Sequence, residues 1–115
     1  PLIARAGLYR AVLARGGRDD EQQRTLFRDG EELLAQAERL NSLRPDVFTL
    51  RAELYWQAPL LAGLDWDTKV VANYRHALAL NPRHYRARLG YAQFLFGQGR
   101  KQEASNIIED GTRYR

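Results

Sequence analysis

The chain contains no cysteine and no methionine among its 115 residues. Without cysteine, a disulfide scaffold, thiol catalysis and cysteine-ligated zinc are excluded. The lack of an initiator methionine favours a fragment of a longer protein. The longest apolar run, residues 58–64, is far shorter than the roughly 20 residues of a membrane helix, and no signal-peptide pattern opens the chain. These absences leave cytoplasmic and periplasmic locations both open.

Acidic residues are also scarce in the C-terminal half of the chain, since residues 66–115 hold nine basic but only four acidic side chains. The net charge is +4, and 16 of the 18 basic residues are arginine. Such an arginine-rich composition is typical of a GC-rich genome, so we expect a bacterial source. A basic half can attract anionic partners, but without a block of like charge or a motif, a solvated surface is the simpler interpretation.

Apolar residues recur at helical spacing along nearly the whole chain, and no segment shows the alternation of a strand. Six helices are predicted through residues 2–15, 26–40, 48–58, 70–80, 85–96 and 104–108. Turns fall at Gly16-Gly17, Pro45, the 59–65 connector, Pro82 and residues 97–99. The second helix begins at an aspartate cap, residue 19 or 20, and the fourth at residue 65 or 67. The fold class is therefore all-α.

One helix of this set contains a glycine, and another is expected to end at one. Gly30 within the second helix costs about 1 kcal/mol relative to alanine, so it marks either a kink or a close contact. The sixth helix is expected to end where it meets Gly111.

The segment Tyr85–Gly111 resembles the tetratricopeptide repeat, a helix pair of roughly 34 residues. Ala92 stands at the small-residue position of its first helix, Gly99 at the turn glycine, and Ala104 at the alanine of its second helix. Arg88 departs from the pattern, since the family has an aromatic residue there. Small residues let paired helices approach closely, so we expect Ala104 in the tightest contact of the pair.

The resemblance extends towards the N-terminus, with Pro82 and Pro45 closing two earlier units. It implies a right-handed α-solenoid of about three helix pairs, one domain over residues 1–115. The units are about 2–45, 46–82 and 83–115. Tyr74 and Ala77 fit the second unit, whereas three surplus residues fall in its apolar connector.

By the same resemblance, the first helix of each pair lines a concave groove that binds a peptide or partner segment. The groove candidates are Arg10, Thr49, Glu53, Trp56, Arg86, Leu89, Gln93 and Phe96. Aromatic and arginine side chains dominate many interfaces, although Trp56 and Phe96 also fit a core role. We therefore expect a non-catalytic scaffolding module for protein–protein interaction.

Two other functions remain open. The chain could be an accessory soluble domain of a bacterial membrane or envelope enzyme, such as a glycan-handling transferase. It could also bind a polyanion, nucleic acid or acidic glycan, although Arg86 and Arg88 lie about 200° apart on a helix and form no single stripe. An oligomer could form through the apolar connector, residues 59–66, or through the open chain ends.

Catalytic chemistry finds little support in the sequence. His76 and His84 are eight residues apart, and neither has a carboxylate three or four residues away. This spacing fits neither a metal-binding pair nor a serine–histidine–aspartate arrangement, and no phosphate-binding loop occurs. We expect no catalytic, cofactor-binding or metal-binding residues in this chain.

Overall fold

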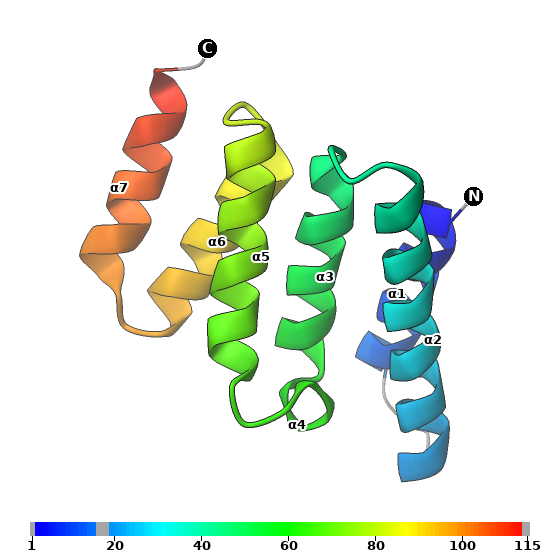
Figure 1. Ribbon diagram of the computed structural model, residues 1–115. Helices are drawn as coiled ribbons and strands as arrows, with labels where there is room; N and C mark the ends of the chain where they lie inside the picture. Colours follow the sequence, from blue (N-terminus) through cyan, green and yellow to red (C-terminus); the bar gives the residue numbers. More distant parts are fainter. Residues whose placement is uncertain (1, 16–18, 114–115) are drawn as a thin grey trace.

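The computed structural model describes residues 2–15 and 19–113, and within these ranges every regular element is helical. The all-α expectation is confirmed, but the described chain has seven helices rather than six (Figure 1). They are α1 (Leu2–Arg15), α2 (Asp20–Leu40), α3 (Pro45–Gln57), α4 (Pro59–Ala62), α5 (Trp66–Leu80), α6 (Tyr85–Gly97) and α7 (Lys101–Thr112).

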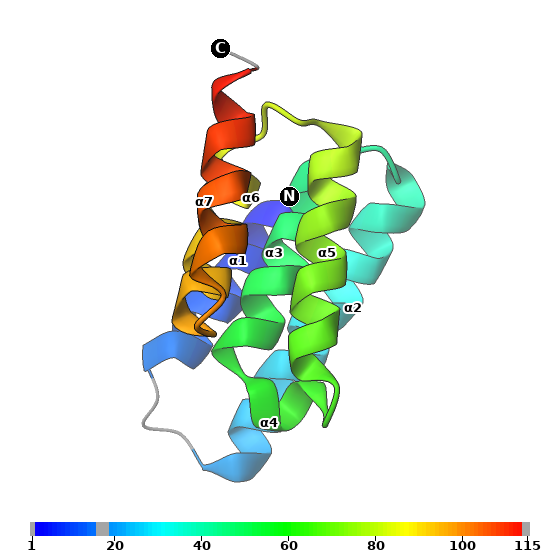
Figure 2. The same cartoon turned by 90° about the vertical axis from the view of Figure 1, so that its left-hand side faces the viewer.

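The helices form the pairs α1–α2, α3–α5 and α6–α7, which stack side by side as an α-solenoid (Figure 1). The α1–α2 pair lies at one end of the stack and α7 at the other. Seen from the side, α2 and α5 lie on one flank of the molecule, and α1 and α6 lie on the opposite flank (Figure 2). The whole measures 43 × 33 × 22 Å. No helix in the described ranges is both long and apolar enough to cross a membrane.

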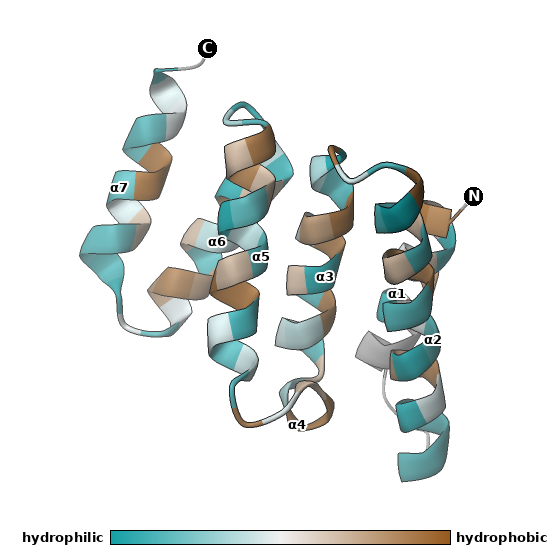
Figure 3. Ribbon diagram, viewed as in Figure 1, coloured by the Kyte–Doolittle hydropathy of each residue, from teal (hydrophilic) through white to brown (hydrophobic). Residues whose placement is uncertain are grey.

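The seventh helix, α4, occupies the connector that the sequence predicted as a loop. Pro59 begins it, because the ring of proline presets the backbone angle of a first helical residue, and Gly63 ends it with a φ of 113°. The connector is strongly apolar (Figure 3). Some of its side chains are buried in the core and others lie in solvent: Ala62 is 6% exposed, whereas Leu60 is 97% exposed.

Capping explains where the longest helix begins. Asp19 caps α2 by accepting a hydrogen bond from the backbone of Gln22 at 2.8 Å, and the Gln22 side chain accepts one from the Asp19 backbone. This reciprocal pair satisfies two backbone donors that a helix start leaves open. Asp65 occupies the cap position of α5 but makes no side-chain cap bond. The turn expected at Gly16-Gly17 lies outside the described residues.

The core runs through all three pairs as one cluster. Leu34 of α2, Leu54 of α3 and Tyr74 of α5 are each 1% exposed. A Cβ added at Gly30 would lie 3.5 Å from Cδ2 of Leu54. Gly30 is therefore a site of close helix contact inside a continuous helix.

The C-terminal pair differs from the sequence expectation at one glycine. Gly111 lies inside α7, which continues to Thr112, so the expectation that the helix ends there was wrong. The side chain of Arg88 packs directly over Gly111 and donates hydrogen bonds to the carbonyls of Pro82 and Ile107 at 2.6 and 2.8 Å. Because glycine has no Cβ, residue 111 leaves room for the Arg88 side chain. Ala104 is buried, at 6% exposed.

Candidate functional site

A cavity of about 450 Å³ opens between the first helices of the three pairs, and we call it the groove pocket. Helices α1, α3 and α6 supply most of its lining, and α5 supplies one tyrosine. The lining residues are Arg10, Glu53, Trp56, Gln57, Tyr74, Gly90 and Gln93.

A charged cluster at one wall of the groove pocket joins α1, α3 and α6. The Arg86 guanidinium donates two hydrogen bonds to the Glu53 carboxylate, Nε to Oε1 at 2.9 Å and Nη2 to Oε2 at 2.7 Å. Arg10 Nε lies 3.5 Å from Oε2 of the same carboxylate. The hydrogen bonds to Glu53 raise the pKa of Arg86 above its ordinary value. Two guanidinium groups share one carboxylate, so the cluster keeps an excess of positive charge.

Two buried polar atoms of the groove pocket have no hydrogen-bond partner within the part of the chain that the structure describes. They are Arg10 Nε and the Tyr74 hydroxyl oxygen, Oη. Tyr74 is only 1% exposed, and its burial, reinforced by the charge of Glu53, raises the pKa of its phenol above the ordinary value. A buried donor without a partner costs about 1–3 kcal/mol. The Tyr74 hydroxyl is therefore without a partner in this part of the chain, whereas Arg10 Nε keeps its 3.5 Å ion pair with Glu53.

Gly90 brings the Tyr74 hydroxyl close to the groove backbone. A Cβ at this position would lie 2.7 Å from Oη of Tyr74 and 3.0 Å from its ring. Any larger residue would push the ring away from its stack on Tyr91, where the ring centroids are 5.8 Å apart. The groove pocket thus depends on a glycine for its depth.

The candidate groove residues separate into three groups. Arg10, Glu53, Trp56 and Gln93 line the groove pocket, and Arg86 joins them through Glu53. Gln93 also lies with Leu89 and Phe96 in a second hollow between α6 and α7.

The third group is a single residue, Thr49. It is 1% exposed and donates a hydrogen bond to the Pro45 carbonyl at 3.0 Å, so it does not reach the groove surface. Thr49 turns inwards because α3 packs against helices on both sides.

The two aromatic candidates differ in their surroundings. Trp56 is partly buried and meets Phe94 edge-on, with ring centroids 5.2 Å apart, so it serves both the core and the pocket wall. Phe96 is 61% exposed and is not a core residue.

Sequence reasoning missed Tyr74 and Gln57 as groove residues. Tyr74 occupies an aromatic core position of a second helix, so the pattern indicated only packing. The one signal in the sequence is its hydroxyl, which a core phenylalanine would lack.

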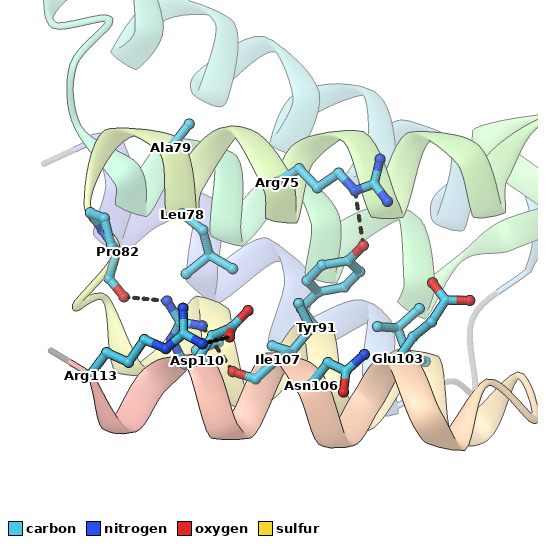
Figure 4. Close-up of a pocket in the computed structure, with 12 residues that line it drawn as sticks. Arg75, Leu78, Ala79, Pro82, Tyr91, Glu103, Asn106, Ile107, Asp110 and Arg113 are labelled. Atoms are coloured by element: carbon cyan, nitrogen blue, oxygen red, sulfur yellow. Dashed lines mark hydrogen bonds and ion pairs between the residues drawn. The ribbon is translucent and has the colours of Figure 1, made fainter.

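A second cleft, of about 520 Å³, lies between α5 and α7 on another part of the surface (Figure 4). Its polar groups bond within the chain. Arg75 Nε donates to the Tyr91 hydroxyl at 3.0 Å, and Arg113 pairs with Asp110 at 3.9 Å. Arg88 holds two backbone carbonyls there, as described above. The groove pocket is therefore the better candidate for ligand recognition.

The basic residues of α6 also find partners inside the chain. Arg86 pairs with Glu53, and Arg88 reaches into the α5–α7 cleft, so the two point to different parts of the molecule. No group of three or more histidine, cysteine, aspartate or glutamate side chains within residues 2–15 and 19–113 is placed to hold a metal ion.

Comparison with known proteins gives one family-model match, in the C-terminal part of the chain. Residues 69–115, which contain most of α5 and all of α6 and α7, match the family model described as "Tetratricopeptide repeat". No curated protein and no solved structure gave a significant match. The resemblance expected from residues 85–111 is thus confirmed, since the tetratricopeptide repeat model matches residues 69–115, which are somewhat less than half of the chain.

Proposed function

We propose that this chain binds a segment of a partner polypeptide in the groove formed by α1, α3 and α6, and that it acts without catalysing a reaction. Tetratricopeptide repeats generally mediate protein–protein interaction, and residues 69–115 match that family. We further propose that the three helix pairs are the units of about 2–45, 46–82 and 83–115, with the groove crossing all three.

The observation that carries the proposal is the Tyr74 hydroxyl in the groove pocket, which has no hydrogen-bond partner among the described residues and lies in the same pocket as Arg10, whose Nε makes only a 3.5 Å ion pair with Glu53. Both can donate a hydrogen bond. A partner carbonyl or carboxylate oxygen that reached the pocket would accept from them and relieve the cost of their burial. The unmet Tyr74 donor and the excess positive charge of the cluster therefore favour an occupant rich in acceptor oxygens, which every polypeptide backbone supplies.

The pocket walls suit the rest of such an occupant. Trp56 offers an apolar ring, and the side-chain amides of Gln57 and Gln93 can each donate and accept hydrogen bonds. The Arg86–Glu53 pair holds α3 and α6 together through two hydrogen bonds. A groove preorganised in this way loses little conformational freedom on binding.

The experiment that tests the proposal selects binding peptides from a displayed library of random sequences, using the 115-residue chain as target. Peptides that bind the wild-type chain are then titrated against Trp56→Ala and Tyr74→Phe, with circular dichroism to verify helical content. We expect each substitution to weaken binding at least tenfold while the helical spectrum stays unchanged.

Leu60→Ala is the matched control, because Leu60 is 97% exposed and belongs to α4, outside the groove pocket. It should leave peptide affinity unchanged. Peptides whose affinity falls with Leu60→Ala but not with Trp56→Ala or Tyr74→Phe would bind elsewhere and contradict the groove.

A further inference from the structure

The α6–α7 end of the stack carries an apolar hollow of about 500 Å³, which we call the terminal hollow. Phe96 and Ile108 are the exposed large apolar side chains in it, at 61% and 47% exposed. The terminal hollow is lined by Leu89, Ala92, Gln93, Phe96, Ala104, Ser105, Ile108 and Glu109.

Each lining position has a counterpart in the preceding pair. Tyr85 of α6 corresponds to Phe48 of α3, 37 residues earlier, and Ala104 of α7 corresponds to Val70 of α5, 34 residues earlier. The counterparts of the eight lining residues are Ala52, Tyr55, Trp56, Pro59, Val70, Val71, Tyr74 and Arg75.

In the preceding pair this face is covered by α6. Phe94 of α6 meets Trp56 with ring centroids 5.2 Å apart, and Tyr91 stacks on Tyr74 at 5.8 Å. The Tyr91 hydroxyl also accepts a hydrogen bond from Arg75 Nε at 3.0 Å. The terminal hollow therefore lies where a further helix that resembles α6 would pack.

Helix α1, at the opposite end of the molecule, corresponds to α6 in the repeat, but no helix among the described residues packs on its outer face. Tyr91 of α6 is 2% exposed, and its counterpart Leu54 of α3 is 1% exposed, because each packs on the preceding pair. The residue of α1 in the same register is Leu8, which is 64% exposed. Ala4, in register with the fully buried Ala87, is exposed as well.

The two ends are also complementary in charge. Arg5 of α1 is exposed, and Glu109 of α7 lines the terminal hollow. Opposite charges on the two faces favour their encounter.

We propose that these two ends bind each other in different copies of the chain, with α1 of a second copy seated in the terminal hollow of the first. This proposal goes beyond the function proposed for the groove and uses none of its residues for contact except Gln93, at the shared edge. The α1 and α7 ends lie at opposite sides of the stack (Figure 1), so the contact joins two different surfaces. Such a contact does not close on itself, and each added copy leaves both end types free. The assembly continues the repeat stack across chains.

The test measures mass by analytical ultracentrifugation from micromolar to millimolar concentration. The wild-type chain should rise above its monomer mass of 13.3 kDa as concentration increases. Leu8→Glu and Phe96→Glu should each stay monomeric, since each places a charge in one of the two apolar faces. Both side chains are exposed, so both variants should keep the circular dichroism spectrum of the wild type.

An equimolar mixture of the two variants gives the decisive result. Leu8→Glu keeps an intact terminal hollow and Phe96→Glu keeps an intact α1, so the mixture should form a dimer of twice the monomer mass and grow no further. Leu60→Glu, at an exposed leucine outside both faces, should assemble like the wild type. A wild-type chain that stays monomeric, a mixture that stays monomeric, or a loss of assembly with Leu60→Glu would each overturn the proposal.

Discussion

Tyr74 offers a prediction whose sign is unusual for a core residue. It is 1% exposed, yet its hydroxyl has no hydrogen-bond partner among the described residues. Replacing it with phenylalanine removes the unpartnered group and keeps the ring that stacks on Tyr91. Most core substitutions destabilise a protein, but Tyr74→Phe should stabilise this one.

The magnitude follows from two opposing effects. Removing the unpartnered hydroxyl relieves about 1–3 kcal/mol of desolvation cost. Losing the oxygen forfeits dispersion contacts of about 0.1–0.2 kcal/mol each, and a single atom has few of them. We therefore expect a net gain of about 1 kcal/mol in the free energy of unfolding, which raises Tm by roughly 4 °C for a chain of this size.

Two other buried tyrosines serve as matched controls. The Tyr55 hydroxyl donates to Glu31 Oε2 at 2.8 Å, and the Tyr91 hydroxyl accepts from Arg75 Nε at 3.0 Å. Their phenylalanine variants should each lose about 1 kcal/mol or more, because the bonding partner is left without its tyrosine. Urea denaturation of the three variants provides the comparison. If Tyr74→Phe destabilises the chain as much as Tyr55→Phe does, the Tyr74 hydroxyl has a partner and the reasoning is wrong.

Further predictions concern packing and pH. Gly111→Ala would place a Cβ against the side chain of Arg88, whose guanidinium is held by two carbonyls. The overpacking should cost about 1–3 kcal/mol, which outweighs the gain of about 1 kcal/mol in helix propensity. Urea denaturation measures the net effect, and an increase in stability would contradict this reasoning. Ala104→Arg places a long charged side chain at a position only 6% exposed and should lower the Tm sharply; an unchanged Tm refutes the packing. Burial raises the pKa of Tyr55 and of Tyr74, so the neutral phenols are favoured in the folded chain. Their contribution to stability is complete below pH 10, the ordinary phenol pKa, and falls above it by up to about 1.4 kcal/mol per pH unit for each tyrosine. Urea denaturation at about pH 9 and about pH 11 checks the decline, which Tyr74→Phe should make shallower.

The destabilising effect expected for Gly111→Ala has a direct control. In the double variant with Arg88→Ala, the space that the arginine occupied becomes free. The alanine should then cost nothing at residue 111, beyond the loss already caused by Arg88→Ala alone. A cost that persists in the double variant would place its origin somewhere other than this contact.

Much of the local structure follows from short stretches of sequence. An aspartate at residue 19 or 20 predicts the start of α2, because a cap needs only residues a few positions apart, and the structure shows that Asp19 is the cap. Asn81-Pro82 predicts the turn before α6, and Ala104 predicts a close helix pair, since small residues at fixed spacing permit close approach. The match to the tetratricopeptide repeat model rests on the same kind of short-range pattern in residues 69–115.

Other features depend on residues that are distant in the sequence. Glu53 and Arg86 are 33 residues apart, and only the stacking of α3 on α6 brings them into contact. The inward turn of Thr49 depends on what covers α3, and the position of Gly111 inside α7 depends on where Arg88 lies. Neither can be obtained from the spacing of apolar residues alone.

By itself, the amino-acid sequence determined the all-helical class, the helix pairs and the repeat-like pattern of the C-terminal part, because these follow from periodicity, caps and turn residues within a few positions of one another. Only the tertiary structure decided which groove residues face the pocket, that Tyr74 supplies an unpartnered hydroxyl to it, and that Leu8 and Phe96 are exposed at opposite ends. The physical reason is that exposure and hydrogen-bond partnership belong to neighbours in space, which the local sequence does not specify.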